Sequence, residues 1–201
     1  MEKIADAGGG QKRNREEKTA MEGKSSIPQS KLSEEDLKVL VENCLLQPKE
    51  LVHWRSSLGE SSPSPKDSEV ILFTPFVKYG LALPACDFLQ GVLYYHGIQI
   101  HHLTPESILH LSVFVHLCEA FLGIEPHFEL FRKLYSLVPG PSRKEMGSFG
   151  CANLELRSEV VDKYLEWPRI HIDPSWSSQW FYIHNQAPSL AKFSADPPVY
   201  V

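Results

Sequence analysis

The chain has 201 residues, of which 42% are hydrophobic and 10% aromatic, and these fractions are typical of a globular protein. Its formal net charge is −5 at pH 7, and from residue 69 onward it holds 9 Lys and Arg against 13 Asp and Glu. A nucleic-acid surface normally needs clustered positive charge, so this balance argues against nucleic acid as the main partner.

The cysteines and the apolar pattern indicate the cellular compartment. The four cysteines form no CxxC pair, and the sequence contains neither a secretory signal nor an apolar run of about 18 residues that would cross a membrane. We therefore expect an intracellular, reducing location, either nuclear or cytoplasmic, and no membrane partner.

The N-terminal segment is polar, and its composition predicts disorder. Residues 1–32 are expected to form a disordered tail, because they bury too little apolar surface to offset the entropy of the chain. The basic cluster Lys12–Arg15 is followed at once by Glu16 and Glu17. We interpret it as part of a solvated tail rather than as a localisation or RNA-contact signal.

Residues 33–68 are predicted to form a helix and a Ser/Pro linker. Ser33 is a typical N-cap, and the apolar positions from residue 37 to residue 45 follow helical spacing until Pro48. The run Ser61–Pro65 predicts an exposed loop. The sequence leaves open whether the stretch from 37 to 54 packs on the rest of the protein.

Residues 69–200 are predicted to form one compact, mostly α-helical (α+β) domain of three to five helices with a few short strands. Strands are expected at Glu69–Phe73 and Trp180–Ile183, and a weaker one at Cys151–Leu156. One helix is predicted after Pro84. Another begins near Pro126 and is expected to run through Val138.

The segment between Thr104 and Gly123 predicts the clearest helix. Thr104 is suited to be the N-cap, Pro105 lies in the first turn, and Gly123 ends the pattern. Only a narrow stripe of Ser112, His116 and Glu119 is polar. We therefore expect this helix to lie at the centre of the domain, buried on several sides.

His116 and Glu119 are the one candidate polar pair, because residues three apart on a helix can meet. The pair could be a general base with its orienting carboxylate, but a mutually satisfied polar pair is the simpler interpretation. His110 and His116 lie about 240° apart around the helix, which disfavours a zinc site. No nucleophile motif or phosphate-binding loop occurs, so we expect no catalytic residue, no cofactor and no metal.

Several aromatic residues could contact a partner. The candidates are Tyr94, Tyr95, Trp180 and Tyr182. We interpret the pair Tyr94 and Tyr95, and likewise Trp180 and Tyr182, mainly as core residues, with a protein-contact role as the alternative.

The central stretch resembles a known family. The matching residues are Gly80–Pro84, Phe88-Leu89, Tyr95–Ile98, His101–Pro105, Ile108–Leu111, Phe114–Phe128, Phe131–Leu134 and Trp180–Ile183. They are similar to the plant domain family named "putative gypsy-type transposase", and the resemblance extends over roughly residues 69–200. It implies origin in a transposable element and lends no catalytic residues.

Three hypotheses are compatible with this sequence. The leading hypothesis is a non-enzymatic interaction or assembly domain of a retrotransposon-derived, Gag-like protein, which binds a protein partner or itself. The alternatives are a nucleic-acid-associated transposition domain, which a basic face would support, and a degenerate element fragment with no selected activity.

Overall fold

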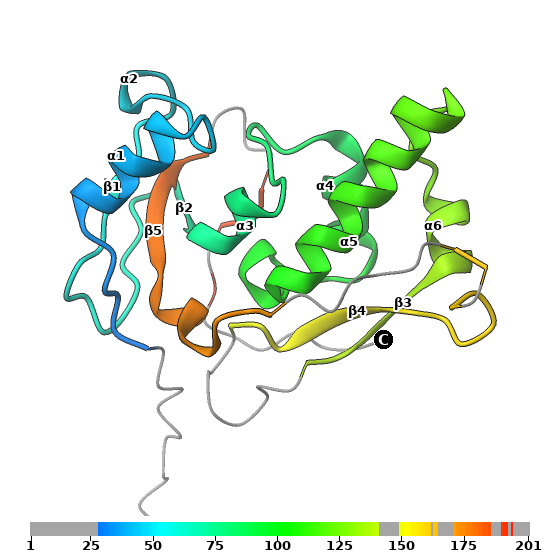
Figure 1. Ribbon diagram of the computed structural model, residues 1–201. Coiled ribbons are helices and arrows are strands. Elements are labelled where there is room, and N and C mark those ends of the chain that lie inside the picture. Colours follow the sequence, from blue (N-terminus) through cyan, green and yellow to red (C-terminus); the bar gives the residue numbers. More distant parts are fainter. Residues whose placement is uncertain are drawn as a thin grey trace, which may run out of the picture.

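The computed structural model describes residues 28–140, 149–161, 163–164, 171–185, 190–192 and 194. In chain order its elements are α1 (Glu34–Glu42), α2 (Lys49–Val52), β1 (Arg55–Ser56), β2 (Glu69–Phe73), α3 (Thr74–Lys78), α4 (Asp87–Tyr95), η1 (Ile100–His102), α5 (Pro105–His116), η2 (Leu117–Leu122), α6 (Phe128–Leu134), β3 (Tyr135–Pro139), β4 (Ala152–Leu156), η3 (Pro174–Ser178) and β5 (Trp180–His184). The expected mostly helical α+β architecture is confirmed (Figure 1).

The main sheet has three antiparallel strands in the order β1-β5-β2. β2 and β5 pair along their whole length, from Glu69 opposite His184 to Phe73 opposite Trp180. Nearly all their side chains are buried, which explains why both segments are continuous apolar runs in the sequence. The predicted strands at 69–73 and 180–183 are therefore confirmed.

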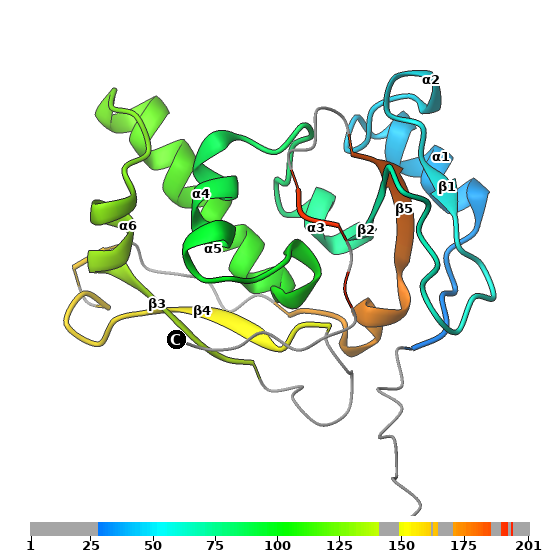
Figure 2. The same cartoon turned by 180° about the vertical axis from the view of Figure 1, so that it is seen from behind.

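Helices α4, α5 and α6 pack together beside this sheet (Figures 1 and 2). Phe88, Phe114 and Phe131, one from each helix, form a triad with ring centroids 5.1 to 5.4 Å apart. Offset and edge-to-face contacts at these distances are favourable for aromatic rings. The triad therefore fixes the three helices relative to one another.

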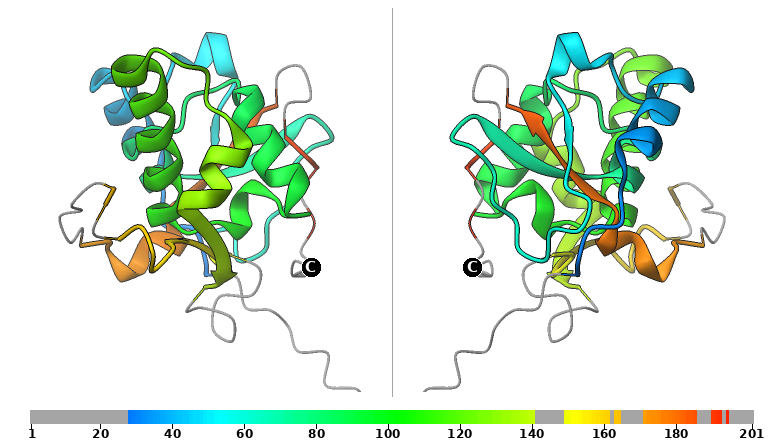
Figure 3. Two further views of the ribbon diagram at one scale, coloured as in Figure 1. Left: turned by 90° about the vertical axis from the view of Figure 1, so that its right-hand side faces the viewer. Right: turned by 90° about the vertical axis from the view of Figure 1, so that its left-hand side faces the viewer.

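The segment before residue 69 belongs to the same core. Leu37 and Leu40 of α1 and Trp54 before β1 are buried in the cluster that contains β2 and β5, and α1 lies against the sheet (Figure 3, right). The question left open for residues 37–54 is thereby answered.

The expected tail over residues 1–32 lies outside the described residues as far as residue 27. Its last five residues, 28–32, are part of the packed structure. Ser30 Oγ donates to the carbonyl oxygen of Trp180 at 2.9 Å, and Leu32 is buried.

The helix predicted from Pro126 through Val138 is shorter than expected. α6 ends at Leu134, and the chain continues as β3, which pairs with β4 in a second, two-stranded sheet. Tyr135 and Val138 favour extended structure, and Pro139 opposes a helix. The extended conformation of residues 135–139 is decided by their pairing with β4. Because β4 is distant in the sequence, the spacing of nearby residues could not predict this pairing.

The central helix is buried only along its first part. Ile108, Leu111 and Phe114 of α5 are buried, whereas the π-helical turn η2 that follows projects from the fold and is mostly exposed. The prediction of burial on several sides is thus wrong for its C-terminal end. Among the described residues, no helix has both the length and the apolar character needed to cross a membrane.

Candidate functional site

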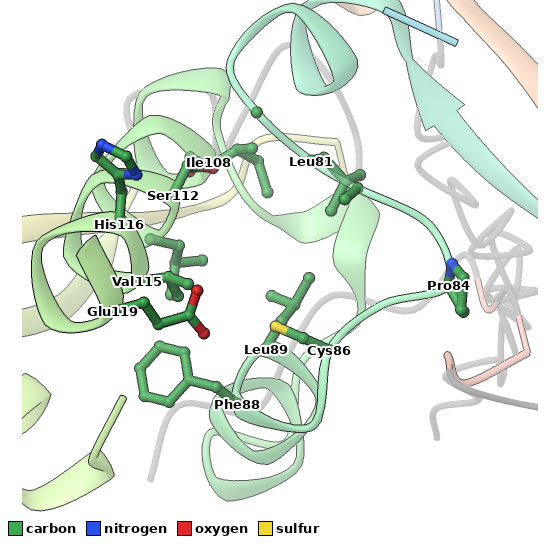
Figure 4. A pocket seen from close by; sticks show the side chains of 13 residues that line it. Leu81, Pro84, Cys86, Phe88, Leu89, Ile108, Ser112, Val115, His116 and Glu119 are labelled. Carbon is green, nitrogen blue, oxygen red and sulfur yellow. Dashed lines mark hydrogen bonds between the residues drawn. The ribbon is translucent and has the colours of Figure 1, made fainter. Parts of the chain in front are cut away.

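A groove lies between α5 and the segment that leads from α3 into α4 (Figure 4). Its volume is about 280 Å³, near the lower end of the range for small-molecule sites. Its lining residues are mostly apolar. They are Gly80, Leu81, Ala82, Pro84, Cys86, Phe88, Leu89, Ile108, Leu111, Ser112, Val115, His116 and Glu119.

At Gly80 the chain comes close to α5, and both Gly80 and Ser112 of α5 line the groove. Gly80 has φ +96°, a conformation that side-chain-bearing residues rarely adopt. A Cβ atom at this position would lie 2.9 Å from Ser112 Oγ. Ser112 Oγ in turn donates to the carbonyl oxygen of Ile108 at 2.9 Å. The absence of a side chain at residue 80 therefore lets the backbone rest directly on α5.

Glu119 and His116 both stand at the rim of the groove, and both are exposed. The Glu119 carboxylate extends toward Phe88 and Cys86, whereas the His116 ring turns away (Figure 4). That ring packs edge-to-face against Phe121, with centroids 5.6 Å apart. The structure brings the two predicted residues to one rim, but no hydrogen bond or ion pair joins their described side chains.

A second groove of about 610 Å³ shares Gly80, Leu81 and Ala82 with the first. Its other walls come from the end of α1 and the chain that follows it, including Val41, Leu45 and Pro48. The short segment from residue 80 to residue 82 is therefore a wall of both grooves.

The buried histidines lie away from these grooves. His110 Nδ1 is 3.0 Å from the carbonyl oxygen of Leu154, and burial lowers the pKa of this imidazole despite that contact. Burial, reinforced by neighbouring His102, holds the pKa of His101 well below its ordinary value. In the part of the chain that the structure describes, no three His, Cys, Asp or Glu side chains are arranged to hold a metal ion.

Five large apolar side chains are exposed at the C-terminal ends of α4 and of the α5–η2 run. Tyr94 and Tyr95 lie at the end of α4, whereas Phe121, Leu122 and Ile124 lie at the end of the α5–η2 run; we call these last three residues the apolar end. Tyr94 and Phe121 are 90% and 73% exposed. The Tyr95 ring packs on Phe128 of α6, with centroids 4.6 Å apart. The start of α4, and not its end, lies beside the end of the α5–η2 run, because Cys86, Phe88 and Leu89 line the groove together with Val115, His116 and Glu119.

The predicted aromatic residues fall into two groups. Trp180 and Tyr182 are fully buried in β5, which confirms their core interpretation and leaves neither at the surface of the folded chain. The core interpretation of Tyr94 and Tyr95 is wrong, because α4 buries Leu89, Val92 and Leu93 instead. The sequence reasoning also missed Phe121, Leu122 and Ile124. The sequence feature that could have identified them is that the helical run is apolar on nearly all sides up to its C-terminal end, where it extends beyond the elements that pack against it.

The comparison with protein families matches residues 70–139 to a family described as "Putative gypsy type transposon". This match runs from β2 to the end of β3 and leaves out α1, β1, β4 and β5. No curated protein and no solved structure matches the chain. The segment that holds the groove and the apolar end is therefore similar to the proteins of a gypsy-type transposon family.

Proposed function

We propose that this chain is a non-catalytic assembly domain of a transposon-derived protein and that it self-associates through the apolar end. The observation that carries the proposal is the exposure of Phe121, Leu122 and Ile124 at the end of the α5–η2 run. Large exposed apolar patches mark interaction sites, and aromatic residues are enriched at the centres of interfaces. Burying these side chains against a second copy removes them from water.

The groove supports the same role. Val115, His116 and Glu119 line it, and Phe121 and Leu122 follow them on the same helical run. A chain that covers the apolar end therefore also reaches the groove. The apolar lining of the groove suits an inserted aliphatic or aromatic side chain.

Charge sets the conditions for association. Two copies with a net charge of −5 each repel one another. This repulsion is strongest at low salt and is largely screened at physiological ionic strength. Hydrophobic association is not screened, so we expect assembly to persist or strengthen as salt is added.

Light scattering on a sizing column tests the proposal, with the full chain over a concentration series at low and physiological salt. The expected result is a mass that rises above one chain as concentration increases. The double variant Phe121→Ser/Leu122→Ser should stay monomeric while keeping the circular dichroism of the parent. Leu58→Ser is the matched control, because Leu58 is 60% exposed but lies outside the apolar end, and it should assemble like the parent. A folded parent that is monomeric at every concentration would contradict self-association.

A further inference from the structure

Four Ser/Thr-Pro dipeptides occur in the chain, and the structure separates them into two classes. They are Ser62-Pro63, Ser64-Pro65, Thr74-Pro75 and Thr104-Pro105. Thr74 and Thr104 are 2% and 9% exposed, and their hydroxyls donate to Gln179 Oε1 at 2.7 Å and to Asn153 Oδ1 at 2.6 Å. Ser62 and Ser64 are exposed in the loop between β1 and β2. Only the two serines are thus open to a modifying enzyme in the folded chain.

We propose that this loop is a phosphorylation site for a proline-directed serine/threonine kinase, with Ser62 and Ser64 as the acceptors. The kinase transfers the γ-phosphoryl group of Mg²⁺-bound ATP. A bond forms between the serine Oγ and the γ-phosphorus, the bond from that phosphorus to the β,γ-bridging oxygen breaks, and ADP leaves. The hydroxyl proton passes to the catalytic carboxylate of the kinase and then to solvent. The proline after each serine has no N–H, which suits a kinase site that offers that position no acceptor.

The two serines differ in how firmly the loop holds them. The Ser64 N–H donates to Tyr182 Oη at 2.7 Å, and Arg55 Nη2 donates to the Ser64 carbonyl oxygen at 3.2 Å. A kinase must break both contacts to extend the backbone at Ser64. No hydrogen bond of the described structure holds the backbone of Ser62. We therefore expect Ser62 to be modified first, with Ser64 slower by about tenfold or more.

A phosphate on Ser64 lies beside an ion-pair network. Arg55 already binds Glu60 at 3.3 Å and Glu69 at 2.8 Å, and Glu60 accepts a hydrogen bond from Tyr182. Lys66 and Asp67 are the other charged residues of this loop, and Asp67 pairs with Lys192. A phosphoserine adds up to two negative charges where two carboxylates already share the Arg55 guanidinium. The resulting repulsion loosens the loop, and salt weakens the effect.

The first experiment incubates the full chain with a purified mitogen-activated-type kinase and Mg²⁺-ATP, followed by mass spectrometry of the intact chain and its peptides. The expected result is one and then two phosphoryl groups in the peptide that spans residues 61–66, with Ser62 filled first. The variant Pro63→Ala/Pro65→Ala keeps both hydroxyls and should be modified more than tenfold more slowly. Ser61→Ala is the matched control and should behave like the parent.

Three outcomes would overturn the site. They are phosphate on Thr74 or Thr104 in the folded chain, equal rates for the parent and the double proline variant, and modification of the urea-unfolded chain but not of the folded one. A standard peptide substrate confirms in each run that the kinase is active.

Thermal unfolding tests the electrostatic consequence separately. In the Ser62→Ala background, phosphorylation of Ser64 should lower the unfolding midpoint by about 2–4 °C at low salt and by less at high salt. The variant Glu60→Gln should reduce the shift, because it removes one of the repelling carboxylates. An unchanged midpoint would sink the proposed loosening.

Discussion

Arg55 and Glu69 form a bidentate ion pair across the central strand of the three-stranded sheet. Arg55 Nε and Nη2 each donate to one carboxylate oxygen of Glu69 at 2.8 Å. β1 and β2, which carry these residues, both pair with β5. The pair therefore crosses Tyr182, whose ring centroid lies 3.6 Å from Arg55 Cζ. Burial favours the neutral form of Glu69, but hydrogen bonds from Arg55 and from the Lys66 N–H outweigh it and lower the pKa of this carboxyl.

Replacing Glu69 tests this pair through the pH dependence of stability. Glu69→Gln should lower the free energy of unfolding at pH 7 by about 2 kcal/mol, because Arg55 loses a charge-assisted partner. The pKa of Glu69 in the folded state lies below its ordinary value of 4.5. Its contribution is therefore fully present above pH 4.5 and is lost as the pH falls through the lowered folded value. Urea unfolding from pH 7 to pH 3 should show a shallower acid slope for the variant.

The matched control for Glu69 is Glu35→Gln. Glu35 pairs with Lys38 at 3.3 Å on the exposed side of α1, where both side chains are solvated. Its loss should change the free energy of unfolding by about 0.5 kcal/mol or less. If the two variants have equal acid slopes, the Arg55–Glu69 pair does not carry the pH dependence assigned to it.

Phe114 and Phe121 test the division of the central helical run into a buried part and an exposed part. Phe114 is fully buried and contacts Phe88 and Phe131, whereas Phe121 is mostly exposed. Phe114→Ala should lower the free energy of unfolding by about 3–5 kcal/mol, and Phe121→Ala by about 0.5 kcal/mol or less. Denaturant unfolding of both variants measures the difference. Similar losses would mean that η2 is buried in solution.

Residues with local signals were predictable from the sequence. Thr104 caps α5 through a bond from the Ser107 N–H, and Gly123 adopts φ +62° at the end of η2, as their residue types indicate. The apolar runs of β2 and β5 identified both strands. Their pairing could not be predicted, because the register of two strands separated by more than a hundred residues depends on tertiary packing.

The candidate site shows the same limit. Helical spacing correctly placed His116 and Glu119 on one stripe, and both line the groove. Spacing alone cannot give side-chain direction, and His116 turns to Phe121 instead. The prediction that Tyr94 and Tyr95 belong to the core is wrong, because both side chains are exposed. Since α4 has only one packed side, their position on the helix decided exposure.

His110 predicts a second pH dependence at milder acidity. Burial lowers the pKa of His110 below 6.5, although the contact with Leu154 and the charges of Glu106 and Glu155 oppose the shift. The unfolded chain therefore binds a proton that the folded chain does not, and stability falls as the pH drops below 6.5 toward the folded pKa. His110→Asn keeps a donor near the position of Nδ1 and removes the titration. Its free energy of unfolding should vary less than that of the parent between pH 7 and pH 5.

The comparison with the parent isolates His110, because His96 and His101, whose pKa values are also lowered, contribute equally to both chains. A slope that is unchanged in His110→Asn would show that folding does not lower the pKa of this residue.

Gly80 contacts α5 and lines the groove, so its substitution should lower the stability of the fold and alter the groove. Gly80→Ala combines the strain of φ +96° with a Cβ only 2.9 Å from Ser112 Oγ, so we expect a loss of about 2 kcal/mol or more in the free energy of unfolding. Gly59→Ala is a matched control, because Gly59 has φ +82° with no atom within 4 Å of an added Cβ, and its cost reflects strain alone. The double variant Gly80→Ala/Ser112→Gly removes the clash but keeps the strain. Glycine inside α5 has a cost of its own, so the double variant is compared with Ser112→Gly. Gly80→Ala should cost about as much in that background as Gly59→Ala costs in the parent, as measured by denaturant unfolding. If Gly80→Ala is as costly in the Ser112→Gly background as in the parent, then the close approach to α5 does not determine why residue 80 is glycine.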